Sequence, residues 1–220
     1  MLIGAMLAVP ALAATETRSV ANFDEVVLDV PGEVSIKQGP QETLTLDAEP
    51  AVLRRITTAI HGRRLLIGLA PGRIETQHPI RMQLGVRTLR ALESRTAAAI
   101  GVGPLRSAAL ALVMGGASTV RLDRLDDAQS LDVRITGAGD VAIGGGKVVA
   151  QKVLITGTGT FAAPQLVSER AEVVIDGHGE VQLAANGTLA VRIAGVGNVR
   201  YHGNPAVTRS ISGVGSIEKD

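Results

Sequence analysis

The chain has 220 residues, with 22 basic and 21 acidic side chains, 26 glycines, no cysteine, and only two Phe, one Tyr and no Trp. A balanced charge without a polybasic segment argues against nucleic-acid binding, and the lack of cysteine excludes disulfides, thiolate metal sites and a cysteine nucleophile. The remaining apolar residues are mainly Ala, Val, Leu and Ile, which suit a core built from β-strands.

Residues 1–13 have the pattern of a secretory signal peptide. An apolar stretch over residues 2–12 leads to small residues at the −3 and −1 positions of a cleavage site after Ala13. The usual basic segment before that stretch is missing, and a buried N-terminal strand or helix is the alternative. We expect export, and no apolar run is long enough for a transmembrane helix.

Residues 20–90 contain short runs of alternating apolar and polar residues between Gly and Pro, which is typical of β-strands. The segment "AVLRRITTAI" (51–60) predicts one helical turn followed by a strand, and "HPIRMQLGVRTLRAL" predicts a strand that enters the repeats. Because repeat proteins need covered ends, we expect residues 20–90 to cap the first coil.

A repeat of about 20 residues fills residues 91–220. It centres on Gly-x-Gly in "ITGAGDVAI", "ITGTGTFAA", "IDGHGEVQL", "IAGVGNVRY" and "ISGVGSIEK". A further copy, "LVMGGASTVRL", precedes these, and "ESRTAAAIGV" is a weaker one around Thr96. A period of this length indicates a solenoid.

Fixed positions around the turn are apolar in nearly every copy. They lie two and four residues before the first Gly and four and six residues after it. Arg209 is an exception in the last copy, which ends in the charged residues Glu218, Lys219 and Asp220. Apolar residues at period two on both sides of a Gly turn predict strand, turn, strand. The polar segments between copies, such as "RLDDAQS", "APQLVSERA" and "AANGT", predict return turns.

Identical columns at a constant period stack most simply in parallel register, with one copy per coil. The sequence therefore predicts an all-β protein, a right-handed single-stranded parallel β-helix with coils of about 18–21 residues and an N-terminal β-strand cap. A Gly-x-Gly in every coil predicts a corner with positive φ or close backbone approach. A dinucleotide-binding loop would occur once, before a helix.

The chain resembles the bacterial head GIN domain family, labelled "putative auto-transporter adhesin". The resemblance rests on "FDEVVLDVPGEVSIKQG", which is similar to the opening hairpin of that family with its Gln-Gly turn, on "HPIRMQLGVRTLRAL", and on the Gly-x-Gly repeats. It implies that residues 20–220 are one head GIN-like domain, in a secreted or envelope β-helical protein of a Gram-negative bacterium.

Asp176, His178 and Glu180 form the densest polar group, at alternate positions around one corner, and Asp140 shares the column of Glu180 two coils away. A β-helix lyase or hydrolase would need such carboxylates in one groove. Turn positions are ordinarily polar and solvated, however, and no neighbouring copy repeats the group. We therefore expect solvated turn residues.

The other polar residues do not indicate a site. No metal-ligand spacing relates the other three histidines, His61, His78 and His202. Ser212 lies in a repeat copy, and we interpret the glycosylation sequon at residues 186–188 as a turn. Four arginines in the mixed columns could line a surface for an anionic polymer, but they are scattered, and we expect a solvated face: Arg121, Arg134, Arg192 and Arg200. An extended aromatic platform for sugars cannot be built from Phe23, Phe161 and Tyr201, and Phe161 falls in a core-facing column.

These observations predict an exported, non-catalytic protein of the cell envelope or surface, an adhesin-like or structural binding module without catalytic, cofactor or metal residues. We expect its partner, a glycan or a protein, to bind a face of the solenoid. Two alternatives stay open, a polysaccharide-degrading β-helix enzyme and a self-assembling envelope scaffold. The charges on the last strand argue against the scaffold.

Overall fold

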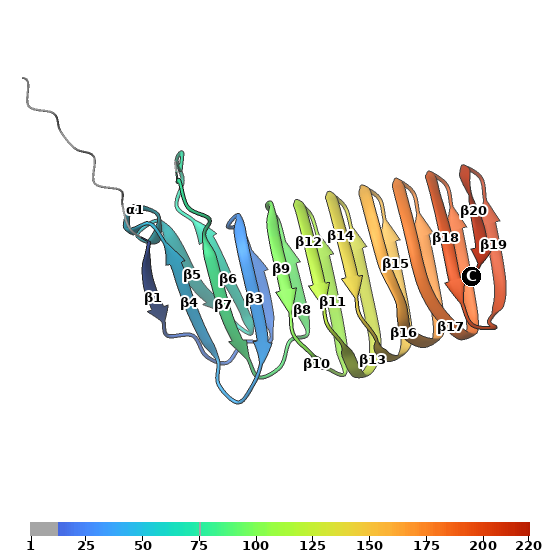
Figure 1. The fold of residues 1–220 in the computed structure, drawn as a ribbon, viewed down its shortest axis with the longest axis horizontal. Coiled ribbons are helices and arrows are strands. Elements are labelled where there is room, and N and C mark those ends of the chain that lie inside the picture. The colour runs from blue at the N-terminus through green and yellow to red at the C-terminus, as the bar shows by residue number, and fades with distance from the viewer. Residues whose placement is uncertain (1–12, 75) are drawn as a thin grey trace, which may run out of the picture.

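The computed structural model describes residues 13–74 and 76–220 (Figure 1). It has 69% of its residues in strands and 2% in helix, and the strands form a β-solenoid. The predicted all-β parallel β-helix is therefore confirmed. The predicted signal peptide lies outside the described residues except for Ala13. Within the described ranges, no helix is long and apolar enough to cross a membrane.

Each repeat contributes strands to two facing sheets, and strands pair in parallel from coil to coil. The shorter strands are β8 (Ala91–Ser94), β9 (Ala98–Val102), β10 (Leu105–Arg106), β11 (Ala109–Met114), β12 (Ala117–Leu122), β14 (Ala138–Ile143), β18 (Val196–His202), β19 (Ala206–Ile211) and β20 (Val214–Lys219). The longer strands continue around a corner of the coil: β13 (Leu125–Ile135), β15 (Gly146–Ile155), β16 (Thr158–Ile175) and β17 (His178–Ile193).

Core-facing residues stack directly on those of the next coil, as the columns predict. In one sheet the fully buried stack is Met114, Ile135, Ile155, Ile175 and Ile193. In the facing sheet it is Val120, Val141, Phe161, Val181 and Val199. Burial of each such side chain stabilises the fold by about 1.5–3 kcal/mol relative to exposure. Because a coil buries its apolar side chains against its neighbours, the repeats depend on one another.

The Gly-x-Gly corners require close backbone approach rather than positive φ. The glycines of these five turns all lie in the described ranges, and none has a positive φ. A Cβ on Gly157 would overlap the carbonyl oxygen of Gly137 in the preceding coil and would lie 2.7 Å from the Thr136 oxygen. A Cβ on Gly179 would lie 2.8 Å from Cδ1 of Ile155. The motif is therefore a packing requirement of stacked corners.

Most residues of the segments between repeats belong to strands, so the prediction of return turns is wrong for them; the last segment does turn, at residues 203–205. β13 and β15 pair at Ala128 and Val148, and β15 and β16 pair at Val148 and Ser168. Polar composition hides the strand alternation here, because even core-facing positions carry small or polar residues such as Ala128 and Ser168. These coils turn their lower corner in Figure 1 through shifts in strand register, and Asp127 has a φ of 60° there.

Residues 20–90 contribute coils whose order in space differs from their order in the chain. β2 (Glu25–Leu28) lies between β6 (Arg64–Leu69) and β8, and β3 (Gly32–Gln38) lies between β7 (Arg81–Val86) and β9, all in parallel. β2 and β3 pair with these neighbours and not with each other, so the expected opening hairpin is wrong. The bend at residues 29–31 sends β3 into the facing sheet, and residues 87–90 cross outside this coil (Figure 1).

Antiparallel strands close the N-terminal end of the solenoid. β4 (Thr43–Ala48) pairs with β7, β1 (Ala14–Arg18) with β4, and β5 (Ile56–His61) with β6. The predicted helical turn is confirmed as α1 (Pro50–Leu53). Arg18 faces the core beside Leu44 and donates hydrogen bonds to the carbonyl oxygens of Leu53 (3.0 Å) and Ile56 (2.7 Å). Its guanidinium thus joins β1 to the opposite sheet across the end of the core.

Candidate functional site

The corner formed by β13, β15, β16 and β17 carries two grooves on its outer surface. The first has a volume of about 390 Å³. Its lining combines the apolar side chains of Val149 and Val167 with charged and amide groups, and Val167 is 37% exposed. The polar lining residues include Asp127, Gln129, Lys147, Glu169 and Asn186.

The second groove, of about 540 Å³, lies along the same strands. Residues in register from coil to coil form its two sides: Ser130, Ala150, Arg170 and Thr188 on one, and Asp132, Lys152, Glu172 and Ala190 on the other. Because strands of a sheet lie about 4.8 Å apart, a groove that crosses four strands extends roughly 15 Å along the solenoid axis. The grooves therefore suit an extended ligand that lies along this axis.

Charged groups of both signs line the second groove. Nζ of Lys152 lies 2.9 Å from Oε1 of Glu172, and both side chains are exposed. Such exposed ion pairs contribute little to stability, so their polar atoms can exchange partners readily. Beneath them, buried Gln151 donates hydrogen bonds to Oγ of Ser168 (2.8 Å) and the carbonyl oxygen of Ala184 (3.0 Å). A side-chain hydrogen-bond network thus fixes the floor of the groove.

Asp176, His178 and Glu180 lie at a Gly-x-Gly corner, apart from both grooves, and all three are exposed. Oε1 of Glu180 lies 3.7 Å from Nη1 of Arg200. Asp140 accepts a hydrogen bond from the backbone N–H of Thr160 (3.1 Å). In the described part of the chain, no three His, Asp or Glu side chains are placed to hold a metal ion.

The other candidates from the sequence are scattered. His61, His78 and Ser212 are exposed, and Nε2 of His202 lies 3.8 Å from Oδ2 of Asp220. The sequon at residues 186–188 lies within β17, so its interpretation as a turn is wrong. Asn186 lines the first groove and Thr188 the second, which brings the sequon to the grooved corner.

The four arginines of the mixed columns do not form one basic surface. Arg121 and Arg200 lie in one sheet, in a column whose intervening members are Ala142, Ala162 and Gln182. Arg134 and Arg192 lie in the other sheet, separated by Leu154 and Val174. An anionic polymer would therefore meet isolated cations on either face.

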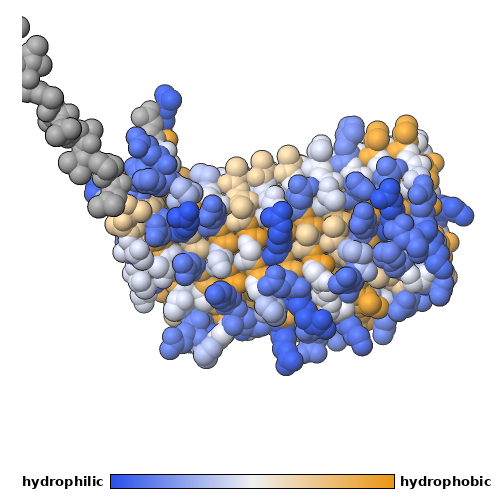
Figure 2. Space-filling view, in the orientation of Figure 1, coloured by the Kyte–Doolittle hydropathy of each residue, from blue (hydrophilic) through white to orange (hydrophobic). Residues whose placement is uncertain are grey.

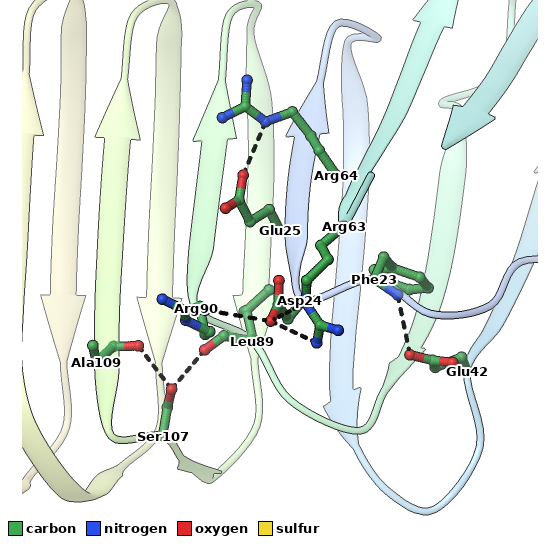
Figure 3. Close-up of polar contacts among 10 residues, drawn as sticks. All are labelled: Phe23, Asp24, Glu25, Glu42, Arg63, Arg64, Leu89, Arg90, Ser107 and Ala109. Carbon is green, nitrogen blue, oxygen red and sulfur yellow. Dashed lines mark hydrogen bonds and ion pairs between the residues drawn. The ribbon is translucent and has the colours of Figure 1, made fainter. Parts of the chain in front are cut away.

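A buried charge cluster lies beside the crossing of residues 87–90 (Figure 3). Asp24 is 2% exposed, and its Oδ2 accepts a hydrogen bond from Nε of Arg63 (2.7 Å) and lies 3.8 Å from Nη1 of Arg90. The hydrogen bond to Asp24 raises the pKa of Arg63 further above its ordinary value. Glu42 accepts hydrogen bonds from the backbone N–H groups ahead of β2, including that of Phe23 (3.3 Å).

Further hydrogen bonds fix the crossing itself. The Gln38 side chain donates to the carbonyl oxygens of Arg87 (2.9 Å) and Arg106 (3.0 Å) and accepts from the Arg106 backbone N–H (2.8 Å). Oγ of Ser107 lies 2.8 Å from the carbonyl oxygen of Leu89. These partners hold residues 87–90 between the β2–β3 coil and the coil that follows it, so we assign the charge cluster to the fold.

The sequence analysis missed both the cluster and the grooves. Asp24 had a signal, because period two places it on the same face as buried Val26 and Leu28. The grooves had none, because their residues come from segments of unequal length and composition.

Comparisons with known proteins agree with this architecture. The family described as "Putative auto-transporter adhesin, head GIN domain" matches residues 22–205. No curated protein matches the sequence of this chain.

Solved structures share the fold at low sequence identity. A putative adhesin from Bacteroides fragilis is 20% identical, with a TM-score of 0.89 over 94% of this chain and 97% of that chain. A putative adhesin from Parabacteroides distasonis is 18% identical, with a TM-score of 0.74 over 96% of this chain and 98% of that one. A protein from the same species, named a putative lipid binding protein, is 19% identical, with a TM-score of 0.73 over 96% and 98%.

Proposed function

This chain belongs to the head GIN domain family of "putative auto-transporter adhesins", and from that premise we propose that it is an exported, non-catalytic binding module of the cell envelope or surface. We propose further that it holds an extended glycan along the grooved corner. The observation that carries this proposal is the second groove, which runs along the axis where four strands are in register, with the first groove beside it on the same strands.

The chemistry of the second groove supports a glycan. Its walls present the hydroxyl groups of Ser130 and Thr188 together with charged donors and acceptors. Ala150 and Ala190 leave room between these groups, and the coil repeat of about 4.8 Å spaces them regularly. Aromatic stacking plays no part, so affinity would come from hydrogen bonds along several coils.

The N-terminal sequence supports export. Cleavage after Ala13 would leave β1 whole, because that strand begins at Ala14 and pairs with β4 over its full length. The mature chain would keep every strand of the fold.

A binding experiment with two matched variants tests the glycan proposal. Purified protein is applied to an array of neutral and anionic bacterial polysaccharides, and binding is measured by biolayer interferometry. Ala150→Trp should fill the second groove and weaken binding at least tenfold. Ala142→Trp is the control, because Ala142 is also half-buried and outward-facing but lies in the other sheet.

Equal binding by both variants would contradict the assignment to this corner. Release of reducing ends or of unsaturated sugars by the wild-type protein would instead support the alternative of a polysaccharide-degrading enzyme. Asp176→Ala and Glu180→Ala would then show whether the Gly-x-Gly corner carries that activity.

A further inference from the structure

The last described coil of the solenoid has unpaired strand edges. Among the described residues, β19 pairs only with β17 and β20 only with β18, so the outer edge of each strand has no partner. Ile211 and Val214 are 43% and 69% exposed there, and Figure 2 shows apolar atoms at this end of the upper edge. Unpaired edges beside exposed apolar side chains are a template for pairing with another chain.

A cation occupies one core-facing column of each sheet in this last coil. Arg209 lies in register with buried Val191, in a column that holds Leu112, Val133, Val153 and Val173 in earlier coils. Lys219 lies in register with half-buried Tyr201, in a column that holds Leu122, Ile143, Ala163 and Leu183. Both columns are otherwise apolar.

Both cations are exposed in the part of the chain that the structure describes. Arg209 has no hydrogen bond or ion pair within the described part of the chain, and Nζ of Lys219 donates to Oδ1 of Asn204 (2.6 Å). The N-terminal end is different, because the core-facing Arg18 donates to backbone carbonyl oxygens and pairs with Glu16 (3.0 Å). The charge of Arg18 thus has partners within the protein, whereas that of Arg209 has none among the described residues.

We propose that Arg209 and Lys219 prevent the last described coil from stacking on the same coil of a second copy of this chain. Such a contact would be two-fold symmetric and would pair β19 and β20 with their counterparts. It would bring four cations into a partly apolar interface, where the carboxylates nearest in sequence are Glu218 and Asp220 beside Lys219 and none adjoins Arg209. Burial of incompletely paired charges is unfavourable. Charged side chains that point inward on edge strands are a known means of preventing such pairing.

The geometry also predicts what removal of these charges would produce. A two-fold contact uses the C-terminal end of both copies and leaves only their N-terminal ends, where different edge strands, β1 and β5, run antiparallel to their neighbours. The product should therefore be a closed dimer and not a fibre. This inference does not depend on the proposed glycan site.

The test compares two double variants by analytical ultracentrifugation between 1 and 100 µM, values chosen to be on the order of weak to moderate dimer dissociation constants. Arg209→Val/Lys219→Leu restores the apolar columns. Arg192→Val/Arg200→Leu is the control, because it also removes two exposed cations but from outward-facing columns of the preceding coil. Far-ultraviolet circular dichroism and thermal unfolding establish that each variant is folded.

We expect the wild-type protein and the control to stay monomeric, and the core-column variant to dimerise at least tenfold more tightly than either. Amide hydrogen exchange in β19 and β20 should slow with concentration in that variant alone. A folded core-column variant that stays monomeric would overturn the inference, and so would a wild-type dimer with protected β19 and β20. If only aggregation of both variants is seen, general exposure of apolar surface is the cause and the inference is also wrong.

Discussion

Gly157→Ala tests the conclusion that the Gly-x-Gly corners are packing requirements. The added methyl group would overlap the carbonyl oxygen of Gly137 and lie 2.7 Å from the carbonyl carbon of Thr136. These are backbone atoms of the preceding coil, so no side-chain rotation relieves the overlap. The corner must move away from its neighbour.

The cost can be estimated from what that movement disturbs. Overpacking in a tight environment costs about 1–3 kcal/mol. Separation also weakens the hydrogen bonds from the Gly157 N–H to the Ile135 oxygen (3.1 Å) and from the Thr158 N–H to the Gly137 oxygen (2.9 Å), each worth about 1 kcal/mol. We expect a loss of about 2–5 kcal/mol in the free energy of unfolding, measured by urea denaturation followed by circular dichroism.

Gly101→Ala is the matched control. A Cβ at Gly101 would meet its nearest backbone atom, the Val34 oxygen, at 3.9 Å, and Gly101 has no positive φ. Alanine there should be neutral or stabilise by about 0.4–1 kcal/mol, because it restricts the unfolded chain. Equal stabilities for the two variants would refute the packing argument.

Three further changes test other parts of the structure. Gln38→Ala removes the side-chain hydrogen bonds that hold residues 87–90 and should cost about 1–3 kcal/mol by urea denaturation; an unchanged midpoint would show that the crossing does not need them. Phe161→Ala empties a fully buried position in the central coils and should cost about 3–5 kcal/mol, whereas a loss below about 1 kcal/mol would contradict its place in a packed core. The backbone N–H of Gln77 donates a hydrogen bond to Glu49 (2.8 Å) and lowers the pKa of that carboxyl group. The contact should therefore be fully present above the pKa that Glu49 has in the unfolded chain, and it should be lost as the pH falls through the pKa that Glu49 has in the folded protein. The protection of the Gln77 amide from hydrogen exchange, relative to its intrinsic rate at each pH, should therefore fall in acid in the wild-type protein and stay constant in Glu49→Gln.

The repeat was predictable because every coil places apolar side chains at the same positions of the core. Apolar residues at fixed distances from Gly157 and its equivalents identify the core-facing columns, and their constant order requires parallel register. Close approach at Gly157 could not be separated from positive φ by sequence, because both demand the absence of a side chain.

Two features were not predictable because they depend on distant parts of the chain. The sequence of β2 and β3 resembles a hairpin. In the structure, however, residues 64–67 pair with one edge of β2 and residues 91–94 with the other, so neither edge is left for β3. The grooves arise where β13, β15, β16 and β17 turn a corner, and the polar residues that line them resemble ordinary turn residues in sequence. Asp24 was predictable in part. Its alternation with Val26 indicates that it is buried, but the sequence does not indicate that Arg63 and Arg90 balance its charge.

Location in the cell tests the account most directly, because an envelope binding module must leave the cytoplasm. A cleavable C-terminal tag, cell fractionation, N-terminal sequencing and protease treatment of intact cells give the answer together. We expect a mature chain that begins at Ala14 in the envelope fraction. Loss of the tag on intact cells would favour adhesion, and a protected tag would favour a periplasmic partner. An unprocessed chain that begins at Met1 in the cytoplasm would contradict the account.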